Sequence, residues 1–237
     1  MTSICAHRGG ALLWPENSLT AFRAALALPI EEVECDVHLS ADGVVHVHHD
    51  ATLDRTTEGN GPIAHRTAAE LAATRLRGLD EGVPTLAALL QMVMASGKLL
   101  RLEIKADHER RHVPALLAAT RADLARIPAR IRLMSFEPAT LLAAAMPDMD
   151  LLIHPRDMPG HSAASLNAYA AALGCTGLGL GHATGLTLDG IAGITNIWRA
   201  DSPAQLAQAF ALAPHSITTD DPVAALTLRA ARATSSA

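Results

Sequence analysis

Residues 32–50 read E-V-E-C-D-V-H-L-S-A-D-G-V-V-H-V-H-H-D, which is two alternating runs of apolar and polar residues joined by Asp42-Gly43. An Asp-Gly pair between two such runs is the strongest short-range signal of a β-hairpin, since both residue types tolerate the backbone of a tight turn. The stretch therefore predicts two antiparallel strands.

The register of this hairpin decides which side chains share a face. A two-residue turn centred on the Asp-Gly pair, counted outward, sets Asp36 opposite His49. Because side chains alternate along a strand, Glu34 then lies on the same face, and His46 and His48 point to the other face and are expected to be structural.

The hairpin also settles the number of strands in the fold. Nine short apolar or β-branched runs alternate with longer Ala/Leu-rich segments, which is typical of a barrel of eight parallel strands. Only a few residues link the second run to the third, too few for parallel neighbours. We therefore expect an α/β TIM (β/α)8 barrel with a short hairpin and a loop insertion after the second strand. The runs are 3–6, 32–39, 44–48, 99–105, 131–136, 151–154, 177–180, 196–200 and 216–219.

The segments between these runs have the composition and length of helices. Thr85, Ser162 and Ser202 are the expected N-caps of three of them. A polar stretch over about residues 50–82 is expected to form an excursion above the strand ends, and the tail after Arg229 to be frayed. The helical segments are 18–28, 85–94, 113–126, 138–146, 162–173 and 203–212.

Composition limits the class of protein. The 237 residues suit a single barrel domain over 1–237. A formal net charge of −5 and the lack of a Lys/Arg cluster argue against a nucleic-acid partner. The chain begins with neither a basic leader nor an apolar segment, and no apolar run reaches about 18 residues, so we expect a cytoplasmic protein without stable membrane anchoring. Homo-oligomerisation stays open.

The three cysteines, Cys5, Cys35 and Cys175, are widely spaced and form no C-x-x-C pair. This spacing does not suggest a zinc site or a redox pair, so we expect small, buried apolar residues. A nucleophilic role for Cys5 or Cys35 is the alternative.

Residues near the N-terminus offer the groups that phosphoryl transfer requires, namely charge neutralisation and two proton carriers. Arg8 can bind phosphate oxygens in a bidentate manner, Glu34 and Asp36 can hold a hard cation, and His7 and His49 titrate near neutral pH. Taken singly, these residues also permit a structural interpretation, with His7 bonded to the backbone, Arg8 on the surface and the two acids in outward salt bridges.

A set of motifs resembles the glycerophosphodiester phosphodiesterase family in order and spacing over the first 105 residues. The motifs are A-H-R-G-G, P-E-N-S-L-T-A-F, E-C-D-V-H-L-S-A-D-G, V-V-H-V-H-H-D, T-L-D-R-T-T-E-G-N-G, V-P-T-L and L-E-I-K. Later fragments resemble the family's remaining strand ends, so the likeness spans nearly the whole chain. They are S-F-E-P at 135–138, W-R-A-D at 198–201 and I-T-T-D-D-P at 217–222.

The resemblance implies a TIM barrel that hydrolyses glycerophosphodiesters to sn-glycerol 3-phosphate and an alcohol with the help of a divalent cation. It implies that His7 and His49 are the catalytic acid and base, and that Gly9 lets the backbone approach closely. An oxygen-only ligand set favours Mg²⁺ or Ca²⁺. The implied metal ligands are Glu34, Asp36 and Glu103. The implied substrate or phosphate ligands are Arg8, Lys105, Glu16 and Trp198.

Several of these assignments keep an alternative. Glu103 and Lys105 are two residues apart, so a plain strand-end ion pair is the other interpretation. Glu16 and Asn17 belong to the first loop, where the family places substrate or supporting contacts, but Asn17 or Ser18 can equally begin the next helix.

The reaction itself also leaves points open. Relatives usually read W-T-V-N where this chain reads Trp198-Arg199-Ala200-Asp201, so the preferred leaving alcohol is open, and the G-L-G-L-G-H segment is expected to line the substrate pocket. The nucleophile is either the substrate's own hydroxyl, through a cyclic phosphate, or water. The rival functions are a lysophospholipase D-like or other phosphodiesterase on the same barrel, and a non-catalytic binding barrel.

Overall fold

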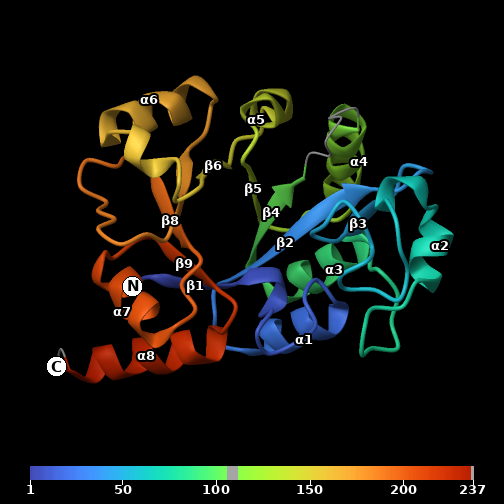
Figure 1. Ribbon diagram of the computed structural model, residues 1–237, viewed down its shortest axis with the longest axis horizontal. Coiled ribbons are helices and arrows are strands. Elements are labelled where there is room, and N and C mark those ends of the chain that lie inside the picture. The colour runs from blue at the N-terminus through green and yellow to red at the C-terminus, as the bar shows by residue number, and fades with distance from the viewer. Residues whose placement is uncertain (106–111, 236–237) are drawn as a thin grey trace.

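The computed structural model describes residues 1–105 and 112–235. Within them, β1 pairs with both β2 and β9, which closes a ring of eight parallel strands in the order β1-β2-β4-β5-β6-β7-β8-β9 (Figure 1). β3 pairs antiparallel with β2, outside the ring. The expected TIM barrel with a hairpin is confirmed. The strands are β1 Ser3–Ala6, β2 Glu32–Leu39, β3 Val45–Val47, β4 Leu99–Ile104, β5 Ile131–Ser135, β6 Met149–Ile153, β7 Gly177–Gly181, β8 Ile194–Trp198 and β9 Ser216–Thr219.

Helices connect the barrel strands, and three begin at the expected caps. The side chains of Thr85, Ser162 and Ser202 each accept a hydrogen bond from a backbone N–H in the first turn of their helix. None of the described helices combines the length and hydrophobicity needed to cross a bilayer. The helices are α1 Leu19–Ala27, α2 Ala68–Ala73, α3 Leu86–Ser96, α4 Val113–Arg126, α5 Pro138–Ala144, α6 Ala163–Ala172, α7 Pro203–Ala211 and α8 Pro222–Ser235, with short 3-10 helices η1 His7–Gly9, η2 Ile63–His65 and η3 Met158–Gly160.

Alternation along the strands separates apolar from charged side chains. In β2, Val33, Cys35 and Val37 are fully buried in the main hydrophobic core, whereas the residues between them, Glu34 and Asp36, are buried carboxylates. Each aliphatic side chain buried in this way contributes about 1.5–3 kcal/mol. Successive residues point to opposite faces, so the apolar set packs against the helices and the charged set enters the barrel.

The barrel interior carries a buried ionic network below these carboxylates. Arg101 of β4 lies 2.5 Å from Glu32 and 2.6 Å from Asp150, and Arg132 lies 2.7 Å from the other oxygen of Asp150. A Cβ at Gly177 would lie 2.2 Å from that carboxylate. The glycines of β7 therefore make room inside the barrel. The expectation that the G-L-G-L-G-H segment lines the pocket holds for His182 and not for these glycines.

The predicted hairpin register is wrong by one residue. Val37 pairs with Val47 and His38 with His46, and Asp36 therefore faces His48 instead of His49. The cause is a longer turn, in which Gly43 has a φ of +84° and its N–H donates to the Ser40 carbonyl. A slip of one residue exchanges the two faces, so His46 lies on the same face as Glu34 and Asp36 instead of the predicted opposite face.

The stretch over residues 50–82 forms the expected excursion, with η2 and α2 inside it. It has its own small core, made by Leu53, Ile63, Leu71, Leu76 and Val83. The prediction of a frayed tail after Arg229 is wrong as far as Ser235, because α8 continues to that residue; residues 236–237 lie outside the described residues. Arg229 ties that helix to the barrel through ion pairs with Glu31 at 2.8 Å.

Candidate active site

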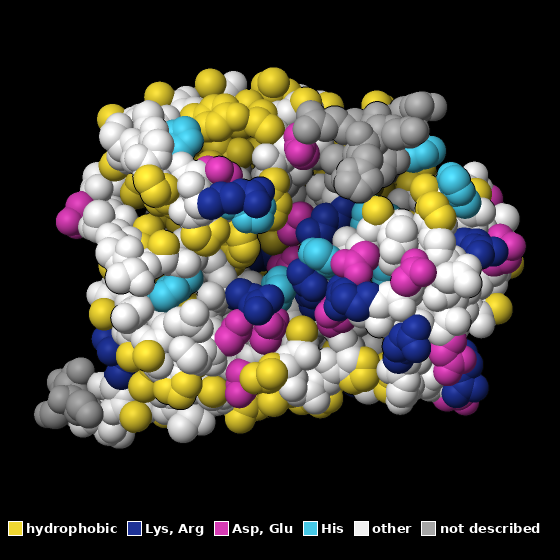
Figure 2. All heavy atoms as spheres, in the orientation of Figure 1, with side chains coloured by type: hydrophobic (Ala, Val, Ile, Leu, Met, Phe, Trp, Pro, Cys, Tyr) yellow, Lys and Arg dark blue, Asp and Glu magenta, His cyan; other side chains and the backbone are white. Residues whose placement is uncertain are grey.

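A pocket of about 650 Å³ lies where the barrel strands end. Charged and histidine side chains gather in this hollow at the centre of Figure 2. Its walls include segments that follow β1, β3, β4, β5, β6, β7 and β8. This is the face on which TIM barrels carry their chemistry.

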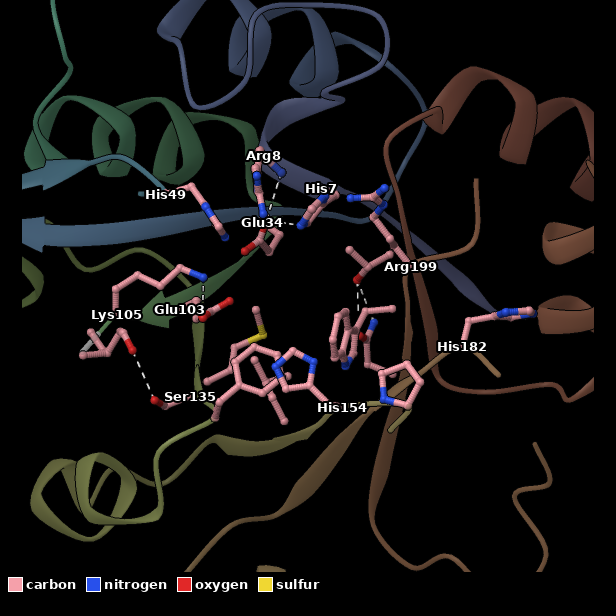
Figure 3. Close-up of a pocket in the computed structure, with 18 of the residues that line it drawn as sticks. His7, Arg8, Glu34, His49, Glu103, Lys105, Ser135, His154, His182 and Arg199 are labelled. Carbon is pink, nitrogen blue, oxygen red and sulfur yellow. Dashed lines mark hydrogen bonds and ion pairs between the residues drawn. The ribbon is translucent and has the colours of Figure 1, made fainter. Parts of the chain in front are cut away.

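Three carboxylates meet at the bottom of the pocket. Glu34 and Asp36 extend from β2, and Glu103 extends from β4 directly beside Asp36 in the strand register. One oxygen of each lies within 4.8 Å of the others. Figure 3 shows Glu34 and Glu103 of this trio. The outward salt-bridge interpretation is therefore wrong, because all three side chains are buried.

Burial and mutual repulsion oppose full ionisation of the three carboxyl groups. Burial raises the pKa of Glu34 well above its usual range, and the neighbouring Asp36 and Glu103 carboxylates raise it further. Burial also raises the pKa of Glu103 to about 7. Burial opposes ionisation of Asp36 as well, but Lys105 and Arg8 hold its pKa below the usual range.

The donor set fits a hard divalent cation. It consists of carboxylate oxygens alone, the ligands that Mg²⁺ and Ca²⁺ prefer. Three carboxylates face two nearby cations, Lys105 and Arg8, so the trio can carry one more negative charge than these side chains neutralise. A metal ion can supply the missing positive charge.

Arg8 is held from three sides at the end of β1. Its backbone N–H donates to Glu34 Oε2 at 2.9 Å, Nη1 donates to Glu16 Oε1 at 3.0 Å, and Nε lies 3.3 Å from Asp36 Oδ2. The next residue, Gly9, has a φ of +81°, and a Cβ there would lie 2.9 Å from Ala21. Gly9 therefore packs closely against the start of α1.

His7 and His49 lie on either side of Glu34 and point into the pocket (Figure 3). His7 Nδ1 lies 2.5 Å from Asp220 Oδ1, and its Nε2 lies 3.9 Å from Glu34 Oε2. His49 Nδ1 lies 2.6 Å from Asp50 Oδ1. An Nδ1–H that donates to a carboxylate leaves Nε2 free to take or give a proton. Burial lowers the pKa of His49, which favours the neutral imidazole.

Lys105 lies between two of the carboxylates. Its ammonium is 2.6 Å from Glu103 Oε1 and 2.9 Å from Asp36 Oδ1. Although burial disfavours the ammonium, these two acids raise the pKa of Lys105 above its usual range. The strand-end ion pair therefore exists, inside the pocket.

The first loop supports the site from behind. Glu16 does not line the pocket, and its carboxylate binds Arg8 and Arg55. Asn17 donates to Asp36 Oδ2 at 2.9 Å, whereas Ser18 caps α1 by accepting from Ala21. Asn17 is thus a supporting contact, and Ser18 begins the helix.

Trp198 lies in the pocket wall, as expected. Its ring packs edge-on against Phe136 and His154, at centroid distances of 5.1 and 5.4 Å. The next residue, Arg199, lies 3.0 Å from Asp220 Oδ2. The wall opposite the acidic trio is therefore aromatic, with a cation beside it.

The cysteines are not nucleophiles in this arrangement. Cys5 and Cys35 are fully buried, and burial raises the pKa of both thiols well above the usual value. Burial raises the pKa of Cys175 to about 11. All three thiols stay protonated, as expected for small apolar residues.

A family model described as the glycerophosphoryl diester phosphodiesterase family matches residues 7–224. The chain belongs to this family. Among solved structures, a candidate glycerophosphoryl diester phosphodiesterase from Agrobacterium tumefaciens superposes with a TM-score of 0.91 at 29% identity, over 99% of each chain. An Oleispira antarctica phosphodiesterase, solved in complex with the product sn-glycerol-3-phosphate, shares the fold with a TM-score of 0.84 at 22% identity, over 96% of each chain.

Curated relatives match over shorter stretches. The glycerophosphodiester phosphodiesterase of Caldanaerobacter subterraneus is 35% identical over 115 residues, which is 44% of this chain and 45% of that protein. Human glycerophosphodiester phosphodiesterase 1 is 40% identical over 92 residues, which is 35% of this chain and 28% of that protein. The matched stretches span less than half the length of these relatives.

Several residues of the site are not predicted from the sequence. They are Asp50, Arg55, Phe136, His154, Arg199 and Asp220. Most of them stand inside motifs already quoted, such as H-H-D and T-L-D-R. The motifs do not reveal contacts such as Asp220 with His7 or Arg55 with Glu16, because these partners are far apart in the sequence.

Proposed function

We propose that this chain is a metal-dependent glycerophosphodiester phosphodiesterase, which hydrolyses its substrate to sn-glycerol 3-phosphate and an alcohol. One observation carries the proposal: two histidines, each with an aspartate on Nδ1, lie on either side of a buried carboxylate trio in one pocket. Family membership and the product named for the Oleispira antarctica neighbour support the choice of substrate class.

The two histidines are proposed to carry the protons. One imidazole Nε2 takes the proton of the attacking hydroxyl, and the other gives a proton to the leaving alkoxide as the P–O bond breaks. Asp220 holds His7 and Asp50 holds His49 in the tautomer that this exchange needs.

The attacking hydroxyl belongs either to water or to the free glycerol end of the substrate. The second route yields a cyclic glycerol phosphate before water opens it. A ³¹P NMR time course distinguishes the routes, because only the cyclic intermediate gives a separate transient resonance.

Arg8 and Lys105 are proposed to stabilise the charge that develops on the phosphoryl oxygens. A divalent cation, Mg²⁺ or Ca²⁺, would be held by Glu34, Asp36 and Glu103. When bound, it would polarise the phosphodiester and offset that charge. Trp198 is proposed to pack on the glycerol or the leaving alcohol, and Glu16 to serve substrate binding through its hold on Arg8.

The test is release of glycerol 3-phosphate from glycerophosphocholine by the purified protein. We expect activity that a chelator abolishes and that Mg²⁺ or Ca²⁺ restores. H7A and H49A should each lose about 10²- to 10⁴-fold in kcat, whereas H65A, at an exposed histidine outside the pocket, should keep it. A protein that binds the substrate but releases no product with either metal would be a non-catalytic barrel.

A second candidate substrate is a lysophospholipid. An apolar groove of about 770 Å³ is lined by Leu13 and Trp14, which follow the His7–Arg8 segment, and by residues of α7 and α8. Leu12, in the same loop, is 66% exposed. An acyl chain could occupy such a groove. If L13D lowers turnover of lysophosphatidylcholine but not of glycerophosphocholine, the groove serves lipid. Equal effects on both substrates would exclude that role.

A further inference from the structure

Arg55 belongs to the excursion over residues 50–82, yet its guanidinium reaches two carboxylates behind the pocket. It contacts Asp50 through Nε at 2.7 Å and Nη2 at 3.1 Å. It contacts Glu16 through Nη1 at 2.7 Å and Nη2 at 2.8 Å. Both contacts are bidentate, the geometry in which an arginine–carboxylate pair is strongest and most directional.

Each of these carboxylates holds a pocket residue. Asp50 Oδ1 lies 2.6 Å from His49 Nδ1, and Glu16 Oε1 lies 3.0 Å from Arg8 Nη1. A single planar group thus stands between the side chain proposed to move a proton and the one proposed to hold phosphate. Neither Arg55 nor the two carboxylates lines the pocket.

We propose that Arg55 is a positioning residue, which sets the orientation of His49 through Asp50 and that of Arg8 through Glu16. The kinetic part of this inference rests on the function proposed above, whereas the structural part does not. In this proposal, the excursion over residues 50–82 places the Arg55 guanidinium against Asp50 and Glu16.

The charges explain why an arginine is needed here. Asp50 and Glu16 both carry negative charge, and although burial opposes their ionisation, hydrogen bonds from Arg55 lower the pKa of each. A lysine offers one ammonium without a rigid fork, so it cannot hold two carboxylates in fixed planes. Without the fork, Asp50 and Glu16 can rotate, and their partners rotate with them.

Loss of Arg55 should spare the fold. Its side chain is 47% exposed, and exposed ion pairs contribute little to the free energy of unfolding. A small displacement of a reacting group, by contrast, can lower a rate about 10²-fold. The two effects can therefore be separated by experiment.

The kinetic test compares R55A with R75A. Arg75 belongs to the same excursion and is 53% exposed, and within the described part of the chain it pairs with Glu58 and Asp80, which do not line the pocket. We expect R55A to lose about 10- to 100-fold in kcat/KM for glycerophosphocholine, R55K to lose less, and R75A to match the unchanged protein.

The contacts of Arg55 with Asp50 and with Glu16 can be tested separately. D50N should lower kcat, because it affects the proton carrier, and E16Q should mainly raise KM, because it affects the phosphate ligand. R55A should show both effects, and in the D50N E16Q background it should cost little more. An R55A loss that persists unchanged in that background would overturn the proposal.

A readout without activity completes the test. In the metal-free protein, ¹H–¹⁵N NMR of the histidine rings should show His49 with its proton on Nδ1, and a mixture of tautomers in R55A but not in R75A. R55Q replaces R55A if the alanine variant does not fold. An unchanged His49 tautomer in R55A would contradict the positioning role of Arg55, whether or not the protein is active. A protein that hydrolyses no glycerophosphodiester would refute the proposed function but not this role.

Discussion

His7 and Asp220 stand 213 positions apart in the chain, and His7 Nδ1 lies 2.5 Å from Asp220 Oδ1. The contact exists because β1 pairs with β9, the last strand of the ring, which closes the barrel. Closure therefore supplies the partner of one proposed catalytic histidine.

This contact predicts the behaviour of an aspartate variant. D220N should lower kcat about 100-fold or more, because the amide can present its N–H to Nδ1 and so favour the wrong tautomer. The measurement is steady-state hydrolysis of glycerophosphocholine. D221N is the matched control, since Asp221 accepts from the Ala224 N–H at the start of α8 and has no hydrogen bond or ion pair with a described histidine. An equal loss in both variants would indicate damage to α8 instead.

The carboxylate trio predicts how pH acts on the metal-free protein. Glu103 has its pKa raised to about 7 in the folded state, so the folded protein holds a proton that the unfolded chain releases above about pH 4.5. Stability from this group is therefore present at low pH and is lost as the pH rises towards 7. Glu34 acts in the same direction, whereas Asp36, with its lowered pKa, does not change in this window.

A divalent cation should reverse that trend. Protons compete with metal for the carboxylates, so the rise in Tm on adding Mg²⁺ or Ca²⁺ should be larger at pH 8 than at pH 6. Thermal unfolding with and without the cation measures it. E103Q should reduce both the pH dependence of Tm and the rise in Tm on adding the cation. A Tm that does not respond to either cation at pH 8 would contradict a metal site here.

The buried network predicts a large stability effect away from the pocket. D150A leaves Arg101 and Arg132 without a shared carboxylate inside the barrel and should cost about 3–5 kcal/mol. Asp148 also contacts Arg132, at 3.3 Å, but is 64% exposed, so D148A should cost less than about 1 kcal/mol. Urea unfolding measures both, and similar midpoints would show that the network contributes little.

Two glycines with positive φ predict a graded pair of variants. Gly43 has open space around its missing Cβ, so G43A should cost only the backbone penalty of about 1–2 kcal/mol. G9A adds a contact of 2.9 Å with Ala21 and should cost more. It should also lower activity, because Arg8 is the adjacent residue. Urea midpoints measure the stability effect, and kcat/KM measures the effect on activity. An equal loss of unfolding free energy in G43A and G9A would show that the close contact with Ala21 has no effect.

The sequence predicted the secondary-structure elements more accurately than the contacts between residues. The nine strand runs, the N-caps and the barrel follow from alternation and short-range hydrogen bonding, which local residues encode. The hairpin was also foreseen, but its register was not, because the turn at Gly43 is one residue longer than the Asp-Gly signal suggests. One residue of turn length was enough to exchange the two faces.

The sequence predicted the carboxylate trio only in part. Alternation places Glu34 and Asp36 on one face of β2, but the ring decides that this face is the inside. Glu103 joins them only because β4 pairs with β2 in that register, across the excursion. The family motifs indicated the same three residues without giving the reason for their proximity.

The sequence by itself determined which side chains can carry charge into the barrel, because the period of a strand fixes the face of every residue along it. Only the tertiary structure decided the partners: Asp220 for His7, and Arg55 as the link between Asp50 and Glu16. Such pairs depend on ring closure and on the path of a long loop. Local patterns do not encode these contacts, because His7 and Asp220, and likewise Arg55 and Glu16, are far apart in the sequence.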